Sequence, residues 1–187
     1  MPTVTLSVEP TSSAPALTLR PWRHDDAPDL VTAHRDPLLR RWLVHHLDDE
    51  AQALGWIDAQ SEGRSAGTRL SFAVLENTAP GEPPARPLGH IALKRTGTPD
   101  SPSAEVGYWT SAAARGRGIA PRALAAVSDW ALGPHSTLPV TRLELLHSVP
   151  NEPSCRVAEK CGYALEAVLA PLPPAYPHKG HLHARLR

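Results

Sequence analysis

The chain has 187 residues, of which 41% are hydrophobic, and its 19 basic and 19 acidic side chains give a formal net charge of zero. This length suits one domain with a sizeable core, and the balanced charge excludes the strong bias typical of nucleic-acid-binding or membrane-surface proteins. The sequence has no apolar run of about 18 residues and no signal-peptide-like start, so we expect a soluble cytoplasmic protein with no nucleic-acid or membrane partner.

The amino-terminal part predicts an unstructured segment, then a strand and helices. Residues 1–15 are rich in Ser, Thr and Pro and are expected to be disordered, which leaves 16–187 as one domain. The alternation in Leu17–Arg20 predicts the first strand. Acidic cap residues then predict three helices, one ending at His34, one over 38–47 and one over 51–61.

Further along, strands alternate with single helices. Two strand-like runs, Leu70–Glu76 and Leu88–Lys94, flank the Pro-rich insert Asn77–Pro87, which we expect to be a surface loop. A helix beginning near residue 119 and ending at Gly133 is expected to bury Ile119, Leu124, Val127 and Ala131. Three more strands are expected, at 143–146, 165–169 and 181–186. This order predicts an α/β (α+β) fold, a mixed sheet with helices on both faces.

The most informative segment, residues 104–124, reads as a short strand that passes through an Arg/Gly loop into a helix. A helix start presents unpaired N–H groups and the positive end of the dipole. Gly116 and Gly118 remove the Cβ atoms that would keep an anion away, and Arg115 and Arg117 flank them. The segment therefore predicts a nest for a phosphate or pyrophosphate, although it matches neither the GxGxxG fingerprint nor a P-loop. A surface loop rich in arginine is the alternative interpretation.

A second segment, Asn151–Tyr163, predicts a capped helix that follows a strand. Asn151 is a good cap candidate, Pro153 fits an early helical position, and Gly162 suits the left-handed residue that closes a helix. A capped helix alone carries no functional meaning. Its position after a strand and about 30 residues beyond the Arg/Gly loop makes the two segments informative as a pair.

Together these segments resemble the two cofactor motifs of the GNAT superfamily of acyl-CoA-dependent N-acyltransferases. Arg115-x-x-Gly118-x-Ala120 resembles the R/Q-x-x-G-x-G/A signature. The second segment resembles N-x-x-S-x-x-V-A-E-K-x-G-F/Y. The stretches Leu17–Ala27 and Asp36–Trp42 are similar to the RimJ/RimL-like branch, the ribosomal-protein N-terminal acetyltransferases. The resemblance runs from about Leu17 to the end of the chain.

The resemblance implies a GNAT-like fold, with a mixed, mostly antiparallel sheet of about six to seven strands flanked by helices. It also implies acetyl-CoA or another acyl-CoA as co-substrate, no metal, an amine acceptor, and a monomer or homodimer. The residues it implies as cofactor contacts are Tyr108, Trp109, Thr110, Arg115, Gly116, Arg117, Gly118, Ile119, Ala120, Asn151 and Ser154.

Two residues are candidates for the chemistry. Glu105 is the expected general base, because alternation places it on the same face of its strand as Gly107 and Trp109 and family members often carry a catalytic glutamate there. An exposed charge at a strand end is the alternative. Ser154 matches the proposed acid of the ribosomal branch, while Ala158 stands where many members carry a tyrosine. Ser154 is equally well interpreted as a contact of the pantetheine arm or the helix backbone.

Histidines and cysteines give weaker signals. His45 and His46 fall where the family forms the acceptor side of its cleft, but adjacent histidines are usually half-exposed surface residues. His178, His181 and His183 alternate near the carboxyl end, and no matching Cys, Asp or Glu spacing accompanies them, so no metal is expected. The two cysteines, Cys155 and Cys161, lie in one predicted helix on faces that cannot meet, which excludes a disulfide between them.

The function expected from this sequence is transfer of an acyl group from acetyl-CoA to a primary amine by direct attack, with a strand N–H over 108–110 polarising the thioester carbonyl. The amine is either a protein N-terminal α-amine or a small-molecule amine. An acidic acceptor cleft at Asp48–Glu50 is one possibility, although a helix start explains these residues equally well. The alternatives are a longer acyl-CoA such as succinyl-CoA, or a binding module with little turnover.

Overall fold

The computed structural model describes residues 3–78, 81, 85–99 and 102–187. The helices are α1 (Ala27–His34), α2 (Pro37–Trp42), α3 (Glu50–Ser65), α4 (Ile119–Leu132) and α5 (Glu152–Lys160), with short 3₁₀ turns at His24–Asp26 and Ala112–Ala114. The strands are β1 (Leu6–Val8), β2 (Leu17–Pro21), β3 (Arg69–Glu76), β4 (Pro87–Arg95), β5 (Ser103–Thr110), β6 (Arg142–Ser148), β7 (Ala164–Leu169) and β8 (Gly180–Leu186).

All the strands belong to one eight-stranded sheet with the order β1-β2-β3-β4-β5-β6-β8-β7. Neighbouring strands are antiparallel except β5 and β6, which are parallel and are connected by α4. The expected mixed, mostly antiparallel sheet is confirmed, with one or two strands more than expected. None of the helices in the described part of the chain combines the length and hydrophobicity that crossing a bilayer requires.

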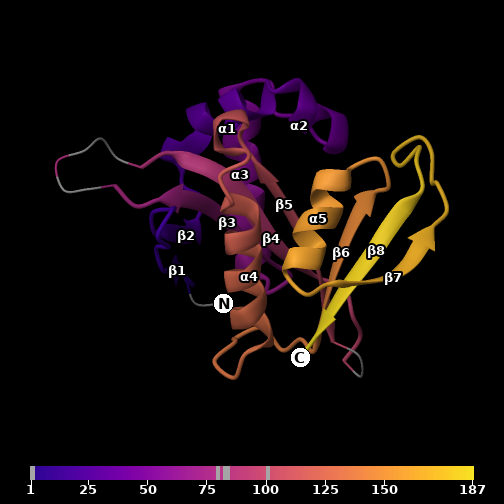
Figure 1. Cartoon of the computed structure of the whole chain (residues 1–187). Coiled ribbons are helices and arrows are strands. Elements are labelled where there is room, and N and C mark those ends of the chain that lie inside the picture. The colour runs from indigo at the N-terminus through magenta and orange to yellow at the C-terminus, as the bar shows by residue number, and fades with distance from the viewer. Residues whose placement is uncertain (1–2, 79–80, 82–84, 100–101) are drawn as a thin grey trace.

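Helices cover both faces of the sheet, and each face has its own core. Figure 1 shows α4 and α5 crossing the near face of the sheet, with α3 behind it. The α4 side buries the four residues expected on that helix together with alternate residues of the central strands. The α1–α3 side buries Trp22, Leu30, Ile57 and Trp109. Because alternate residues of β5 belong to different cores, Glu105, Gly107 and Trp109 share the α1–α3 side as the alternation predicts.

Three local elements differ from expectation. Strand β1 (Leu6–Val8) lies inside the segment expected to be disordered, because it pairs antiparallel with Leu17–Leu19. Helix α3 runs four residues beyond Ser61 and ends before Gly67, whose φ of +71° suits a closing glycine. Most of the predicted loop at 77–87 lies outside the described residues.

Helix α2 is shorter than expected and ends at Trp42. Leu43 is already extended, with φ −92° and ψ 136°. The His46 ring nitrogen Nε2 lies 3.0 Å from the Arg40 carbonyl and 3.1 Å from the Leu43 carbonyl, and Leu47 is buried in the α1–α3 core. The His46 side chain bonds the carbonyls near the end of α2, and Leu47 reaches the core although it lies in a loop. Residues 43–47 therefore do not need to be helical to satisfy these carbonyls or to bury Leu47.

Candidate active site

The two parallel strands at the centre of the sheet separate before they end. Pairing of β5 with β6 runs from Ser103–Arg142 to Val106–Leu145 and stops there, whereas β5 stays paired with β4 as far as Thr110. A cavity of about 600 Å³ opens beside the separated ends. Its walls come from α2, the end of β5, the loop into α4, and α5.

Backbone geometry shapes the floor of this larger cavity. Gly116 and Gly118 have φ values of +74° and +73°, and a Cβ at either position would project into open space. Gly118 is the N-cap of α4, so no side chain caps the first N–H groups of that helix. The open glycines and the uncapped helix start have the geometry that an anion nest requires, and anion binding there stays a prediction.

The charges of the larger cavity have one sign. Arg115, Arg156 and Lys160 contribute to its lining, and no carboxylate side chain does so among the described residues. Arg115 also binds the carboxylate of Asp36, the N-cap of α2. Although burial alone would raise the pKa of Asp36, the Arg115 hydrogen bond and the N–H of Leu38 lower it overall. The cavity therefore suits a ligand that carries several negative charges.

Arg117 does not line this cavity. Its guanidinium instead binds the Glu76 carboxylate at the end of β3. The other ten residues expected at the cofactor, including Asn151 and Ser154, all line the larger cavity. Both arginines flank the glycines in the sequence, but Arg115 lines the cavity and Arg117 does not.

The start of α5 forms the opposite wall. Asn151 is the N-cap by position, but its side chain makes no capping hydrogen bond, which leaves the amide available to a ligand. Ser154 lies beside the hydroxyl of Tyr108, which is buried and has no hydrogen-bond partner among the described residues. Burial raises the pKa of Tyr108 to about 12, with Ser154 opposing the rise. The Tyr108 hydroxyl consequently stays protonated near neutral pH and is available as a donor at the wall of the cavity.

The opened edge of β5 offers backbone donors. The N–H of Ser111 donates to the Leu88 carbonyl of β4 at 2.8 Å, so alternation turns Trp109 toward β4 as well. The N–H groups of Tyr108 and Thr110 consequently point to the side that β6 has left. An extended ligand with amide groups can pair with this edge as an additional strand does.

A smaller cavity, of about 200 Å³, lies on the α1–α3 side of the same strand. Glu105 lines it, and the larger cavity does not include Glu105. Leu43, Tyr108 and Trp109 line both cavities, so the two meet at the end of β5.

A row of charged residues crosses the sheet at the level of Glu105. Arg69 pairs with Lys94, Lys94 with Glu105, and Glu105 with Glu144, from β3 to β6. Arg69, Lys94 and Glu105 line the smaller cavity, which therefore carries two cationic groups and one carboxylate. Sequence reasoning selected Glu105 but missed both cations, because only the strand register brings them to it.

Two buried histidines complete the smaller cavity. Burial lowers the pKa of His34 to about 4, with His46 and Arg40 adding to the effect, and both ring nitrogens lack a partner among the described residues. Burial lowers the pKa of His90 to about 3, and His90 Nδ1 accepts a hydrogen bond from Trp22 Nε1 at 3.0 Å. Both rings are neutral at physiological pH. Neither was selected from the sequence, which offered no pattern around them.

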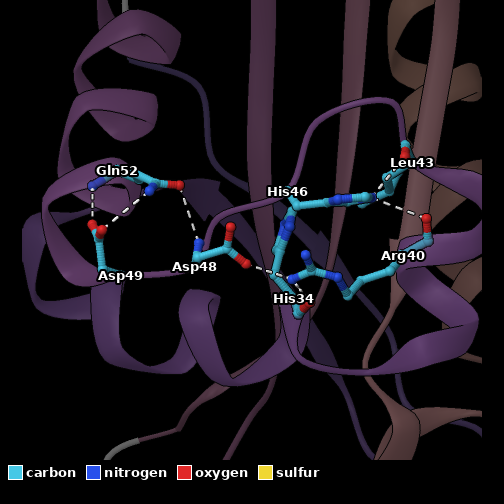
Figure 2. A network of polar contacts seen from close by, with 7 residues as sticks. All are labelled: His34, Arg40, Leu43, His46, Asp48, Asp49 and Gln52. Carbon is cyan, nitrogen blue, oxygen red and sulfur yellow. Dashed lines mark hydrogen bonds and ion pairs between the residues drawn. The ribbon is translucent and has the colours of Figure 1, made fainter. Parts of the chain in front are cut away.

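Figure 2 shows how the loop after α2 is held beside this cavity. Arg40 reaches the Asp48 carboxylate at 2.6 Å, and His46 turns back toward the Arg40 and Leu43 carbonyls. His45, by contrast, lines the smaller cavity. The two adjacent histidines therefore have different surroundings, and only His45 faces a site.

Asp48–Glu50 do not form an acidic acceptor cleft, because none of the three lines either cavity. Asp48 is bonded to Arg40, and Asp49 caps α3 by accepting from the Gln52 N–H at 2.8 Å. These contacts agree with the helix-start interpretation of Asp48–Glu50.

The sequence analysis also did not identify α2 as an apolar wall of the larger cavity. The feature that could have indicated it is Leu38, which is 54% exposed on a short helix.

The family model described as an acetyltransferase (GNAT) domain matches residues 16–164. A comparison with curated proteins gives no match.

Solved structures share the fold at low sequence identity. The ribosomal L7/L12 alpha-N-protein acetyltransferase RimL is 17% identical, with a TM-score of 0.77 over 98% of this chain and 96% of that one. RimJ of Mycobacterium smegmatis in complex with CoA-disulfide is 21% identical, with a TM-score of 0.76 over 98% and 86%. The microcin C7 self-immunity acetyltransferase MccE, in complex with acetyl-CoA and AMP, is 17% identical, with a TM-score of 0.74 over 91% and 92%.

Proposed function

Because the chain belongs to the GNAT acetyltransferase family and uses acetyl-CoA, we propose that it acetylates a primary α-amine that enters through the smaller cavity. The observation that carries the proposal is the meeting of two unlike cavities at Tyr108 and Trp109. The larger one has cations, an anion nest and no carboxylate in its described lining. The smaller one holds Glu105. Cofactor and acceptor would thus approach the same strand end through two separate openings.

Acetyl-CoA would be held in the larger cavity by groups already in position. The pyrophosphate binds the N–H groups at the start of α4, with Arg115 and Gly116 beside it. The pantetheine arm pairs with the opened edge of β5, between Tyr108 and the start of α5. This arrangement directs the thioester carbonyl to the N–H groups of Tyr108 or Thr110, which act as oxyanion donors.

Acyl transfer then needs one base and one proton donor. The amine nitrogen attacks the carbonyl carbon, the C–S bond breaks, and the proton lost by the amine passes to Glu105 directly or through water. The thiolate takes a proton from the Ser154 hydroxyl, which regains one from solvent water, and the Tyr108 hydroxyl beside it is also protonated. An α-amine with a pKa near ~7.7–8.0 needs less help than a lysine side chain near ~10.4, so positioning supplies most of the rate.

The charges of the smaller cavity favour a particular acceptor. Lys94 lies beside Glu105 in the strand register and Arg69 lies beyond Lys94, and both cations line the smaller cavity, so an amine with a nearby carboxylate fits better than a basic one. The resemblance to RimJ and RimL supports a protein N-terminus. A small-molecule amine is the second candidate, which the volume of about 200 Å³ favours.

The test is release of CoA thiol from acetyl-CoA by the purified full chain. The panel contains peptides with free N-termini followed by acidic, neutral or basic residues, the same peptides with blocked N-termini, free amino acids and polyamines. We expect turnover with free α-amines, fastest beside acidic residues. Equal turnover with blocked peptides that contain lysine would contradict the α-amine assignment. Tight acetyl-CoA binding without turnover on any amine would favour a longer acyl group, for which succinyl-CoA is the first probe, or a binding module.

A further inference from the structure

Four side chains with metal-binding atoms converge on the carboxyl-terminal half of the sheet. They are His147 on β6, Cys155 on α5, and His181 and His183 on β8. One ligand atom from each lies within 4.8 Å of the others. His178, the third histidine of the carboxyl-terminal group, is exposed in the loop before β8 and is not part of this cluster.

The fold explains why residues so distant in sequence meet. Strands β6 and β8 are antiparallel, and their register places His147 opposite His181 and Leu145 opposite His183. His181 and His183 are two residues apart, so they project from the same face of β8. Helix α5 packs on that face and presents Cys155 to both rings, with Sγ 3.9 Å from His181 Nδ1 and 3.7 Å from His183 Nε2.

These separations are close to those of a tetrahedral site. Zinc binds imidazole nitrogen at about 2.0–2.1 Å and thiolate sulfur at about 2.3 Å, so two ligands on one ion lie roughly 3.5 Å apart. The three imidazole rings have centroids 5.2 to 5.8 Å from one another. A contraction of about 1 Å at the widest pair, within reach of small side-chain rotations, closes the group around one ion.

The hydrogen bonds that the imidazole rings make to backbone carbonyls also support a metal site. His147 Nδ1 lies 2.9 Å from the Ser148 carbonyl, so its N–H donates outward and the lone pair stays on Nε2. That Nε2 is buried and has no partner among the described residues. His183 Nδ1 lies 3.3 Å from the Tyr163 carbonyl, which leaves Nε2 directed at Cys155. Ring N–H groups donated to carbonyls are typical of metal-ligating histidines, since they fix the tautomer.

Packing alone does not explain this arrangement. His183 is fully buried, and His147 contributes an unpartnered nitrogen, so the cluster buries polar groups where aliphatic side chains would cost less.

We propose that His147, Cys155, His181 and His183 bind one zinc ion in a closed tetrahedral site. The donor set of three imidazoles and one thiolate suits zinc and not the oxygen-seeking Mg²⁺ or Ca²⁺. Binding forms three N–Zn bonds and one S–Zn bond and releases the thiol proton, for which the Glu159 carboxylate, 3.6 Å from Sγ, is the nearest acceptor. Four protein ligands leave no open position, so the site is structural.

The proposed ion would join α5 to β6 and β8. Cys155 follows Ser154, which lines the larger cavity, so the same helix turn contacts both the ion and the cofactor site. The sequence argument against a metal rested on the missing partner of the histidines. The fold supplies that partner from α5, and acyl transfer itself needs no metal.

The test uses the untagged full chain, stripped with a chelator and reloaded with ZnCl₂ or CoCl₂. We expect about one equivalent of zinc to survive dialysis, as in structural sites. The cobalt form should give intense four-coordinate visible bands and a thiolate-to-cobalt charge-transfer band. Zinc should also raise the melting temperature of the wild-type chain. Substoichiometric zinc, or a weak six-coordinate cobalt spectrum without the thiolate band, would overturn the proposal.

Variants assign the ligands. Cys155→Ser should abolish the charge-transfer band, and His181→Asn, at a partly exposed position, should weaken zinc retention at least tenfold. The matched controls are Cys161→Ala and His178→Asn, which remove the other thiol and the nearby histidine and should leave the spectrum unchanged. Loss of the band in these controls, or its survival in Cys155→Ser, would contradict the assignment. Because the wild-type cobalt spectrum depends on no variant, a variant that fails to fold does not remove the test.

Discussion

The two cavities that meet at Tyr108 and Trp109 are built in different ways. The larger one is shaped mainly by two short stretches of chain, the loop into α4 and the start of α5, and much of its chemistry comes from backbone N–H groups. The smaller one takes its side chains from α1, α3, β3, β4, β5 and the loop after α2, and its chemistry comes from charges and imidazoles.

Because of this difference, different kinds of substitution should alter the function of each cavity. A cavity made of backbone geometry tolerates changes in side chains but is sensitive to any change in φ, as at Gly118. A cavity made of side chains from distant elements can change specificity one residue at a time while the fold stays the same.

Replacing the base should affect turnover and spare the cofactor. Glu105→Gln is expected to lower kcat by roughly 10²- to 10⁴-fold, because general base catalysis supplies about that factor, with acetyl-CoA affinity within about twofold of wild type. Steady-state kinetics and calorimetric titration measure the two quantities. Glu144→Gln is the control, since Glu144 pairs with Glu105 across the sheet but lines neither cavity. Equal losses in both variants would make Glu105 an ordinary strand charge.

Acid should destabilise the fold through the two buried histidines of the smaller cavity. His34, with a folded pKa of about 4, and His90, with about 3, stay neutral where the unfolded chain, with its ordinary histidine pKa of 6.5, takes up protons. Their stabilising contribution is therefore present above about pH 6.5 and lost as the pH falls toward about 4. For His34 alone the loss in free energy of unfolding is on the order of 3 kcal/mol.

Urea unfolding at a series of pH values measures this slope. His34→Gln should flatten it, and His135→Gln, at an exposed position outside both cavities, should not. The described lining of the larger cavity contains no histidine, so acetyl-CoA contacts add nothing to this pH dependence. An unchanged slope in His34→Gln would show that other groups carry it.

A matched pair of glycine variants tests the backbone origin of the larger cavity. Gly118 and Gly162 have φ values of +73° and +76°, so alanine at either position should cost about 1–2 kcal/mol in stability. Only Gly118→Ala should also weaken acetyl-CoA binding, by about tenfold, because its methyl group enters the anion nest. Equal affinity loss in Gly162→Ala would indicate a general effect of destabilisation.

Acceptor charge should give the smallest effect. Lys94→Gln is expected to raise KM severalfold for peptides with acidic residues after the N-terminus and to leave neutral peptides unchanged, because an exposed charge contributes less than about 1 kcal/mol. Kinetics at two ionic strengths measure it. Lys179→Gln, in the exposed loop before β8, is the control. No difference between acidic and neutral peptides would remove Lys94 from acceptor recognition.

The sequence predicted best what depends on neighbouring residues. The buried face of α4 and the left-handed Gly162 depend on local sequence, and both agree with the structure. The predicted end of α2 was wrong, because His46 bonds the Arg40 carbonyl and Leu47 packs in the core without a helical backbone. No local rule indicates such contacts.

What the sequence missed depends on strand register. Arg117 binds Glu76 on β3, Lys94 and Arg69 reach Glu105 through three strands, and Cys155 meets histidines from two others. A shift of one residue in any of these strands would turn its side chains to the other face. Pairing of distant segments therefore determines the acceptor cavity and the histidine cluster.

The early separation of β5 and β6 also has a consequence for the life of the protein. Unpaired strand edges usually invite other chains and aggregation, but this one lies inside the sheet, where only a narrow, extended molecule can reach it. A cofactor bound there acts as a removable strand. At a concentration about 100 times its Kd it would add about 2.7 kcal/mol to stability. The supply of acetyl-CoA would thereby influence how long each molecule resists unfolding and proteolysis.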